Sequence, residues 1–124
     1  MIEPGDAFLA GTGFLGEVTC RGTRAVGLFW SAALGWPLVW DRDEETAVQS
    51  PDGGTKVSWG GEPVDPDAPP QRQRLELVAT DLEAAVGRLV ALGATRVDDP
   101  ATPDPALAVT LADPDGQVFR VIVG

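Results

Sequence analysis

Hydrophobic and polar residues follow two periods along this chain, and the same succession of periods occurs twice. Residues 23–34 and 82–92 repeat apolar side chains at the three- and four-residue spacing of an amphipathic helix, and each run ends in Leu-Gly. Other stretches are shorter, and several of them alternate apolar with polar residues, as strands with one buried face do. The pattern predicts two helices, with strands at residues 14–20, 38–41, 46–49, 57–59, 73–79, 95–97, 107–111 and 117–123.

A turn motif marks the repeat. Asp113-Pro114-Asp115-Gly116 precedes the last strand, and Ser50-Pro51-Asp52-Gly53 stands at the corresponding place in the first half. Proline fixes φ at the second turn position, and glycine accepts the positive φ that closes the turn. Each half therefore consists of the succession β-α-β-β-β, and the chain contains two copies of one small unit.

These copies predict an α+β fold with an N-terminal arm at 1–13 and one domain at 14–124. We expect the first module at 14–60, a linker rich in proline and glycine at 61–71, and the second module at 72–124. One helix covers only one face of four strands, so each sheet keeps a helix-free face. We expect the two helix-free faces to curl into a shared concave cavity, and function to lie there.

Composition narrows the range of partners. The chain has 124 residues, one domain's length, and a formal net charge of −10. Nucleic acids and anionic membranes reward Lys and Arg, so we expect neither as a partner, whereas a cationic small molecule would be favoured. The acid excess has the alternative explanation that it only keeps the protein soluble. Because no apolar run approaches the ~20 residues of a membrane span and the first residues lack a basic start, we expect a cytoplasmic protein.

The chain contains no histidine, no tyrosine and one cysteine, Cys20. Ser-His-Asp and Cys-His nucleophile systems and histidine-based metal triads are therefore excluded. Carboxylates remain as candidates for acid-base chemistry, and carboxylates and one thiol remain as candidate metal ligands. The flanking residues predict that Cys20 lies in a strand as a buried, inert thiol.

Four stretches in this order resemble the vicinal oxygen chelate superfamily, which includes glyoxalase, bleomycin-resistance and extradiol dioxygenase proteins. They are GLFWSAALGW at 27–36, TDLEAAV at 80–86, LGA at 92–94 and DPDG at 113–116. The resemblance covers residues 14–124 and is strongest to the single-chain, two-module, glyoxalase-like branch. It implies the glyoxalase/bleomycin-resistance/dioxygenase fold, which hosts many functions. Together with uncovered sheet edges, it also implies a homodimer.

The resemblance further implies where metal ligands would lie. Counting from the helices and turns places them at Leu15, Arg74 and Arg120, with the fourth at Val57 or Ser58. None of these is a good ligand and two are cations, so we expect no metal and no other cofactor. The alternative is a metal site that is displaced from these positions and formed by the carboxylates of Glu17 and Glu76. Two adjacent guanidinium groups disfavour the binding of a hard cation there.

Strand alternation predicts that Glu17, Arg74, Glu76 and Arg120 point into the cavity. One interpretation is a structural ion-pair network that satisfies buried charge. The functional interpretation is that Arg74 and Arg120 bind a carboxylate, phenolate or enolate, with Glu17 or Glu76 as general base.

Tryptophan supplies an unusual share of the aromatic residues. Trp30 is predicted to pack in the first helix, whereas Trp36 and Trp40 flank the following strand and are predicted, with Trp59, to contact ligand. Indole faces stack on planar ligands and attract cations. The alternative for each of these side chains is a position in the core.

The sequence therefore predicts a metal-independent, glyoxalase-like small-molecule-binding protein that sequesters a planar or cationic ligand, similar to the bleomycin-resistance branch. The alternative is a metal-free isomerase, lyase or cyclase with a Glu base and Arg anion clamps, so whether the protein is an enzyme stays open. A third alternative is a scaffold or regulatory domain whose concavity is filled by a neighbouring chain.

Overall fold

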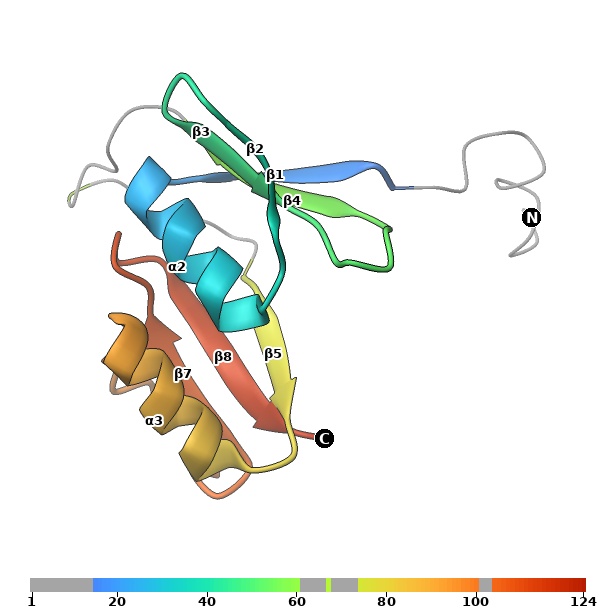
Figure 1. Cartoon of the computed structure of the whole chain (residues 1–124). Coiled ribbons are helices and arrows are strands. Elements are labelled where there is room, and N and C mark those ends of the chain that lie inside the picture. The colour runs from blue at the N-terminus through green and yellow to red at the C-terminus, as the bar shows by residue number, and fades with distance from the viewer. Residues whose placement is uncertain (1–14, 61–66, 68–73, 101–103) are drawn as a thin grey trace, which may run out of the picture. The chain divides into compact units, whose positions relative to one another are not determined.

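The structure is a computed structural model that describes residues 15–60, 67, 74–100 and 104–124. The chain divides into two compact units, Met1–Gly61 and Glu62–Gly124, to which the names first and second module apply from here on. Each module contains a four-stranded sheet and a helix (Figure 1). No helix of the described residues is long and apolar enough to cross a membrane.

The first module consists of β1 (Glu17–Arg21), α2 (Arg24–Leu34), β2 (Leu38–Arg42), β3 (Glu45–Val48) and β4 (Lys56–Gly60). Its sheet has the order β1-β4-β3-β2, with β1 parallel to β4 and the other neighbours antiparallel. Thr23 begins α2, because its side chain accepts a hydrogen bond from the backbone N–H of Val26. Gly35 ends the helix with a φ of 68°, in the left-handed region.

The core of the first module lies between α2 and one face of the sheet. Trp30 of α2 stacks on Trp59 of β4, with ring centroids 5.9 Å apart and an angle of 3° between the rings. The fully buried Thr46 donates its hydroxyl proton to the carbonyl oxygen of Trp59 across 3.4 Å. Gly27 lets the helix approach this point, since a Cβ there would lie 2.6 Å from Thr46 Cβ. This packing leaves the other face of the sheet without a helix.

A bidentate salt bridge ties the start of α2 to β2. Arg24 Nε and Nη2 each lie 2.8 Å from a carboxylate oxygen of Asp41. This hydrogen bond lowers the pKa of Asp41 below its usual range and raises the pKa of Arg24. Asp41 also brings a negative charge to the first turn of a helix that contains no acidic residue there.

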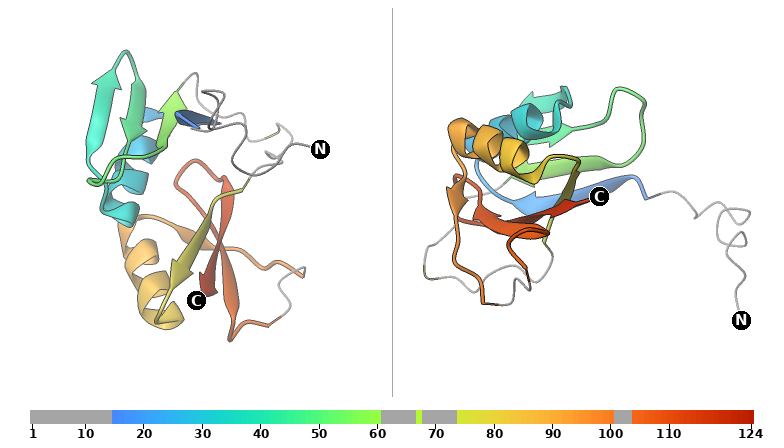
Figure 2. Two further views of the ribbon diagram at one scale, coloured as in Figure 1. Left: turned by 90° about the vertical axis from the view of Figure 1, so that its right-hand side faces the viewer. Right: turned by 90° about the horizontal axis from the view of Figure 1, so that it is seen from below.

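The second module consists of β5 (Glu76–Ala79), α3 (Leu82–Leu92), β6 (Thr95–Arg96), β7 (Ala108–Ala112) and β8 (Val118–Val123). Its sheet has the order β5-β8-β7-β6, with β5 parallel to β8. Helix α3 lies on one side of this sheet (Figure 2), and the core between them contains Val86, Leu89, Leu111, Phe119 and Val121. The opposite face of the sheet carries Glu76 and Arg120.

A helix cap and a turn fix the ends of these elements, and the turn lies where the sequence predicts it. Asp81 caps α3 by accepting from the backbone N–H of Ala84. In the turn before β8, Asp113 Oδ1 accepts from the backbone N–H groups of Asp115 and Gln117, and Gly116 has a φ of 87°. The Asp113 side chain thus accepts, within the turn, the backbone hydrogen bonds that a neighbouring strand accepts within a sheet.

The predicted α+β fold with two βαβββ modules is confirmed. Differences lie at strand ends: the first strand begins at Glu17 and the fifth at Glu76, because β1 and β5 pair only where β4 and β8 run beside them. Residues 1–14, 61–66, 68–73 and 101–103 lie outside the described residues, and with them the predicted arm and most of the predicted linker. The domain boundaries therefore stay a prediction.

Candidate functional site

A groove of about 570 Å³ opens on the helix-free face of the first sheet. Strand alternation places Glu17 and Thr19 of β1 there, next to Lys56 and Ser58 of β4 in strand register. The groove is lined by Glu17, Thr19, Val39, Trp40, Glu45, Thr46, Ala47, Lys56, Ser58, Trp59 and Gly60. All four strands of the first module contribute to it.

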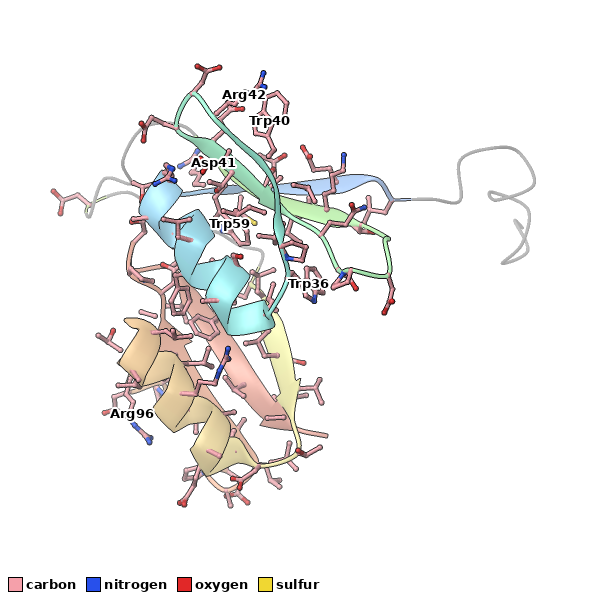
Figure 3. The ribbon with its side chains drawn as sticks, in the orientation of Figure 1. Trp36, Trp40, Asp41, Arg42, Trp59 and Arg96 are labelled. Carbon is pink, nitrogen blue, oxygen red and sulfur yellow. The ribbon has the colours of Figure 1, made fainter. Side chains whose placement is uncertain are left out.

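An irregularity in β2 shapes one wall of the groove. The register between β2 and β3 shifts between Leu38 and Trp40, so Val39 is an extra residue at this edge of the sheet. Both Val39 and Trp40 are therefore at the groove, 45% and 48% exposed. The Arg42 guanidinium carbon lies 5.4 Å from the centroid of the Trp40 ring, and Figure 3 shows the two side chains together, away from α2. Trp40 thus combines an apolar surface with a nearby cation.

Hydrogen bonds order the polar floor of the groove. Thr19 Oγ1 lies 3.4 Å from Glu17 Oε2, and Ser58 Oγ lies 3.2 Å from Thr19 Oγ1. A carboxylate only accepts, so Thr19 donates its single hydroxyl proton to Glu17 and Ser58 must donate to Thr19. Ser58 then presents only lone pairs to the groove. Apart from Lys56, the side chains of this floor favour ligands with N–H or O–H groups.

The helix-free face of the second sheet has a different chemistry. Arg120 lies in register with Glu76 of β5 on one side and Thr110 of β7 on the other. Asp99 follows β6, and its Oδ2 lies 3.7 Å from Arg120 Nη2, 3.9 Å from Arg74 Nη1 and 3.2 Å from Thr110 Oγ1. A single carboxylate oxygen therefore lies near two cations and a hydroxyl.

The predicted site residues fall into two separate groups. Glu17, Trp40 and Trp59 line the groove of the first module, whereas Arg74, Glu76 and Arg120 belong to the second module. Trp59 is 2% exposed and its ring stacks on Trp30, so this side chain packs in the core of the first module.

Trp36 follows the end of α2 and is half-buried, and its carbonyl oxygen accepts from Ser31 Oγ (Figure 3). It does not belong to the residues that line the groove.

Sequence reasoning named neither Asp99 nor Thr19 as a site residue and considered Ser58 only as an expected metal position. Strand alternation placed Thr19 on the same face as Glu17, and the alternation Lys56-Val57-Ser58-Trp59 would have placed Ser58 there. Asp99 lies outside any strand, in a loop rich in proline and aspartate, and carries no local signal of its partners.

The residues at the expected metal positions do not fit a divalent cation. Leu15 is exposed and apolar, while Arg74 and Arg120 bring positive charge next to Asp99. Val57 is half-buried, and Ser58 donates to Thr19. The described residues also contain no group of three His, Cys, Asp or Glu side chains suited to a metal ion.

Structures of known proteins share the fold. A glyoxalase/bleomycin resistance protein/dioxygenase family enzyme from Burkholderia phytofirmans PsJN is 16% identical, with 86% of this chain and 94% of that chain covered and a TM-score of 0.61. TnmS3, an antibiotic binding protein from Streptomyces sp. CB03234, is 22% identical, with coverages of 88% and 93% and a TM-score of 0.58. Oxidase ChaP-H2 is 17% identical, with coverages of 89% and 92% and a TM-score of 0.60.

At these identities the likeness concerns the fold alone. A comparison with curated proteins gave no match. The sequence itself matches the family described as "Glyoxalase-like domain" over residues 17–122, which is most of both modules. The chain belongs to the glyoxalase-like domain family, within the vicinal oxygen chelate superfamily.

Proposed function

We propose that the protein binds a planar, cationic small molecule in the groove of the first module and sequesters it without a metal. The observation that carries the proposal is the exposed ring of Trp40 above a floor that ends in carboxylate and hydroxyl acceptors. An indole face attracts planar and cationic groups, and Glu17 and Glu45 supply negative charge beside it. Lys56 lies opposite Glu17 and repels a cation, so the cationic group of the ligand has to bind away from the Lys56 ammonium group or displace it from Glu17.

Two further observations support the capture of a cationic small molecule. The net charge of −10 favours a cationic ligand over the whole molecule. A protein of the same fold, TnmS3, is an antibiotic binding protein, so this architecture is compatible with capture of a small molecule. Sequestration requires tight stoichiometric binding and recovery of the ligand unchanged.

The second candidate is a metal-free isomerase, lyase or cyclase. It is favoured by the hydrogen bond that Glu17 receives from Thr19 at the groove, which orients a carboxylate as a possible general base. Substitution of Glu17 by Gln separates the two candidates once a ligand is known. Sequestration predicts weaker binding with no change in the ligand, whereas catalysis predicts loss of product formation with binding retained.

The test of binding uses three probes that separate shape from charge. Proflavine is a planar cation, 2-naphthoate a planar anion, and tetraethylammonium a non-planar cation. We expect proflavine to bind most tightly, measured by calorimetry and tryptophan fluorescence. Trp40→Ala is expected to weaken proflavine roughly 5- to 30-fold, because a cation–π contact contributes about 1–2 kcal/mol.

Trp36→Ala is the matched control, since Trp36 is a half-buried tryptophan that does not line the groove. Equal loss of proflavine binding in both variants, or tighter binding of 2-naphthoate than of proflavine, would count against this site.

We also propose that the protein is a homodimer. The sheet orders place β1, β2, β5 and β6 at sheet edges, and unpaired edges are prone to association. Sedimentation equilibrium measures the mass directly, and a monomer at micromolar concentration would contradict this part of the proposal.

A further inference from the structure

Three donors from the second module converge on one oxygen. Arg74 Nη1, Arg120 Nη2 and Thr110 Oγ1 lie 3.9, 3.7 and 3.2 Å from Asp99 Oδ2. Charge-assisted hydrogen bonds between guanidinium and carboxylate groups are about 2.7–2.9 Å long. The two arginines therefore lie near Asp99 without making close hydrogen bonds to it, and their N–H groups retain capacity for another acceptor.

The donors and the acceptor differ in how firmly the backbone holds them. Arg120 and Thr110 face each other in the β7–β8 ladder, and the backbone N–H of Arg120 bonds to the carbonyl of Leu75, next to Arg74. Asp99 lies beyond the end of β6, outside the ladder. Donors that a sheet holds in place are preorganised for a ligand. The Asp99 carboxylate, which accepts from them in the unliganded protein, lies on an irregular segment.

The arginines are also accessible. The side chains of Arg74 and Arg120 are 49% and 29% exposed, whereas that of Asp99 is 15% exposed beneath them. An incoming anion can therefore reach both guanidinium groups from solvent.

From this geometry we infer that Arg74, Arg120 and Thr110 form a binding site for a carboxylate ligand, and that Asp99 is its internal occupant. Binding requires the ligand carboxylate to take the place of the Asp99 carboxylate, which turns towards solvent. The ligand is a monocarboxylate and not a phosphate, because Asp99 and the neighbouring Glu76 repel a dianion more strongly. This site lies in the second module, whereas the groove of the proposed function lies in the first, and it takes a ligand of the opposite charge.

Asp99→Asn is the decisive substitution. It keeps the shape of the side chain and an acceptor for Thr110, but it removes the competing charge. Asp98→Asn is the matched control, since Asp98 is the exposed neighbour and its substitution changes the net charge by the same amount. Benzoate binding is measured by calorimetry for both variants and the wild type.

We expect Asp99→Asn to bind benzoate roughly tenfold or more tightly than wild type, because an intrachain competitor acts at a high effective concentration. Asp98→Asn should match the wild type, and Arg120→Gln added to Asp99→Asn should abolish the gain. Equal affinity in the two Asn variants would overturn the inference, as would tighter binding of inorganic phosphate than of benzoate.

Two measurements keep the test independent of folding and of the groove. If Asp99→Asn does not fold, the wild type is titrated with benzoate instead. The backbone amide NMR signals of residues 110 and 120 should then shift in the wild type and should not shift in the Arg120→Gln variant. Absence of these shifts in the wild type contradicts the site. Trp40→Ala is expected to leave benzoate binding unchanged, so the groove and this site fail or succeed separately.

Discussion

Substitution of Gly27 by Ala tests how closely α2 approaches its sheet. A Cβ on Gly27 would lie 2.6 Å from Thr46 Cβ and closer still to Thr46 Oγ1. Thr46 is fully buried, branched at Cβ and hydrogen-bonded to the carbonyl of Trp59, so it cannot turn aside. The helix has to shift away from the sheet instead, and this shift also disturbs the packing of Trp30 on Trp59.

The expected loss follows from two opposing contributions. Overpacking in a core typically lowers the free energy of unfolding by about 1–3 kcal/mol, and the rigid neighbour favours the upper end. Helix propensity raises it by about 1 kcal/mol, because Ala is a better helix former than Gly. The net expectation is a protein less stable by about 2 kcal/mol, or a melting temperature lower by roughly 8 °C.

Gly87 provides the matched control. It lies inside α3, also an 11-residue helix, and a Cβ there would meet nothing within 4 Å. Gly87→Ala should therefore stabilise the protein by about 0.5–1 kcal/mol. Both substitutions change the unfolded chain in the same way, so the difference between them in urea unfolding isolates the clash of Gly27→Ala in the folded state. If both variants are equally stable, the close approach of α2 to Thr46 is wrong.

Two further predictions concern the first module. Asp41→Asn should remove part of the acid sensitivity of folding. Because the pKa of Asp41 is lowered in the folded protein, the bridge to Arg24 contributes fully above about pH 4 and is lost as the pH falls through the lowered pKa. The free energy of unfolding, measured between neutral and acidic pH, should therefore fall less in the variant than in the wild type. Trp59→Phe should lower the free energy of unfolding by about 1–2 kcal/mol. It should also abolish the circular-dichroism signal of the parallel Trp30–Trp59 pair, and an unchanged spectrum would contradict the stacking.

Most of the fold could be predicted because its signals are local. Helical periodicity predicted both helices, and Leu-Gly predicted their ends, where Gly35 and Gly93 are the C-caps. Alternation in β8 also separated Arg120 from the buried Phe119 correctly. Each of these features depends on a few neighbouring residues, so periodicity and turn chemistry are sufficient to find them.

The candidate site was less accessible to prediction because it depends on pairing between strands. The sequence Leu38-Val39-Trp40-Asp41 has no alternation, so the irregularity that exposes Val39 and Trp40 could not be read from it. Asp99 lies in a loop, and only the folded sheet brings it to Arg120. Trp59 was predicted to contact ligand, with the core as the alternative, although its alternation with Lys56 and Ser58 would have indicated the core position that the structure gives it.

The two modules begin their parallel strand pairs in the same way and then differ. Glu17 lies opposite Lys56 in the first, and Glu76 lies opposite Arg120 in the second. Two residues further on, the first module pairs Thr19 with Ser58, whereas the second pairs Val78 with Ile122. The hydroxyl pair is therefore a feature of the groove and not a requirement of the fold.

This difference makes a double substitution informative. Thr19→Val with Ser58→Ile gives the first module the residue pair of the second, and β-branched side chains suit strands, so the protein should fold with little change in stability. Removal of the hydroxyl that accepts from the ligand and of the one that orients Glu17 should weaken proflavine binding roughly 10- to 150-fold, since a hydrogen bond to a charged group contributes about 1.5–3 kcal/mol. The reverse exchange, Val78→Thr with Ile122→Ser, should leave proflavine binding unchanged, because these residues belong to the other module. Proflavine affinity that survives the first exchange would show that Trp40 alone binds the probe and that the ordered hydroxyls have no part in recognition.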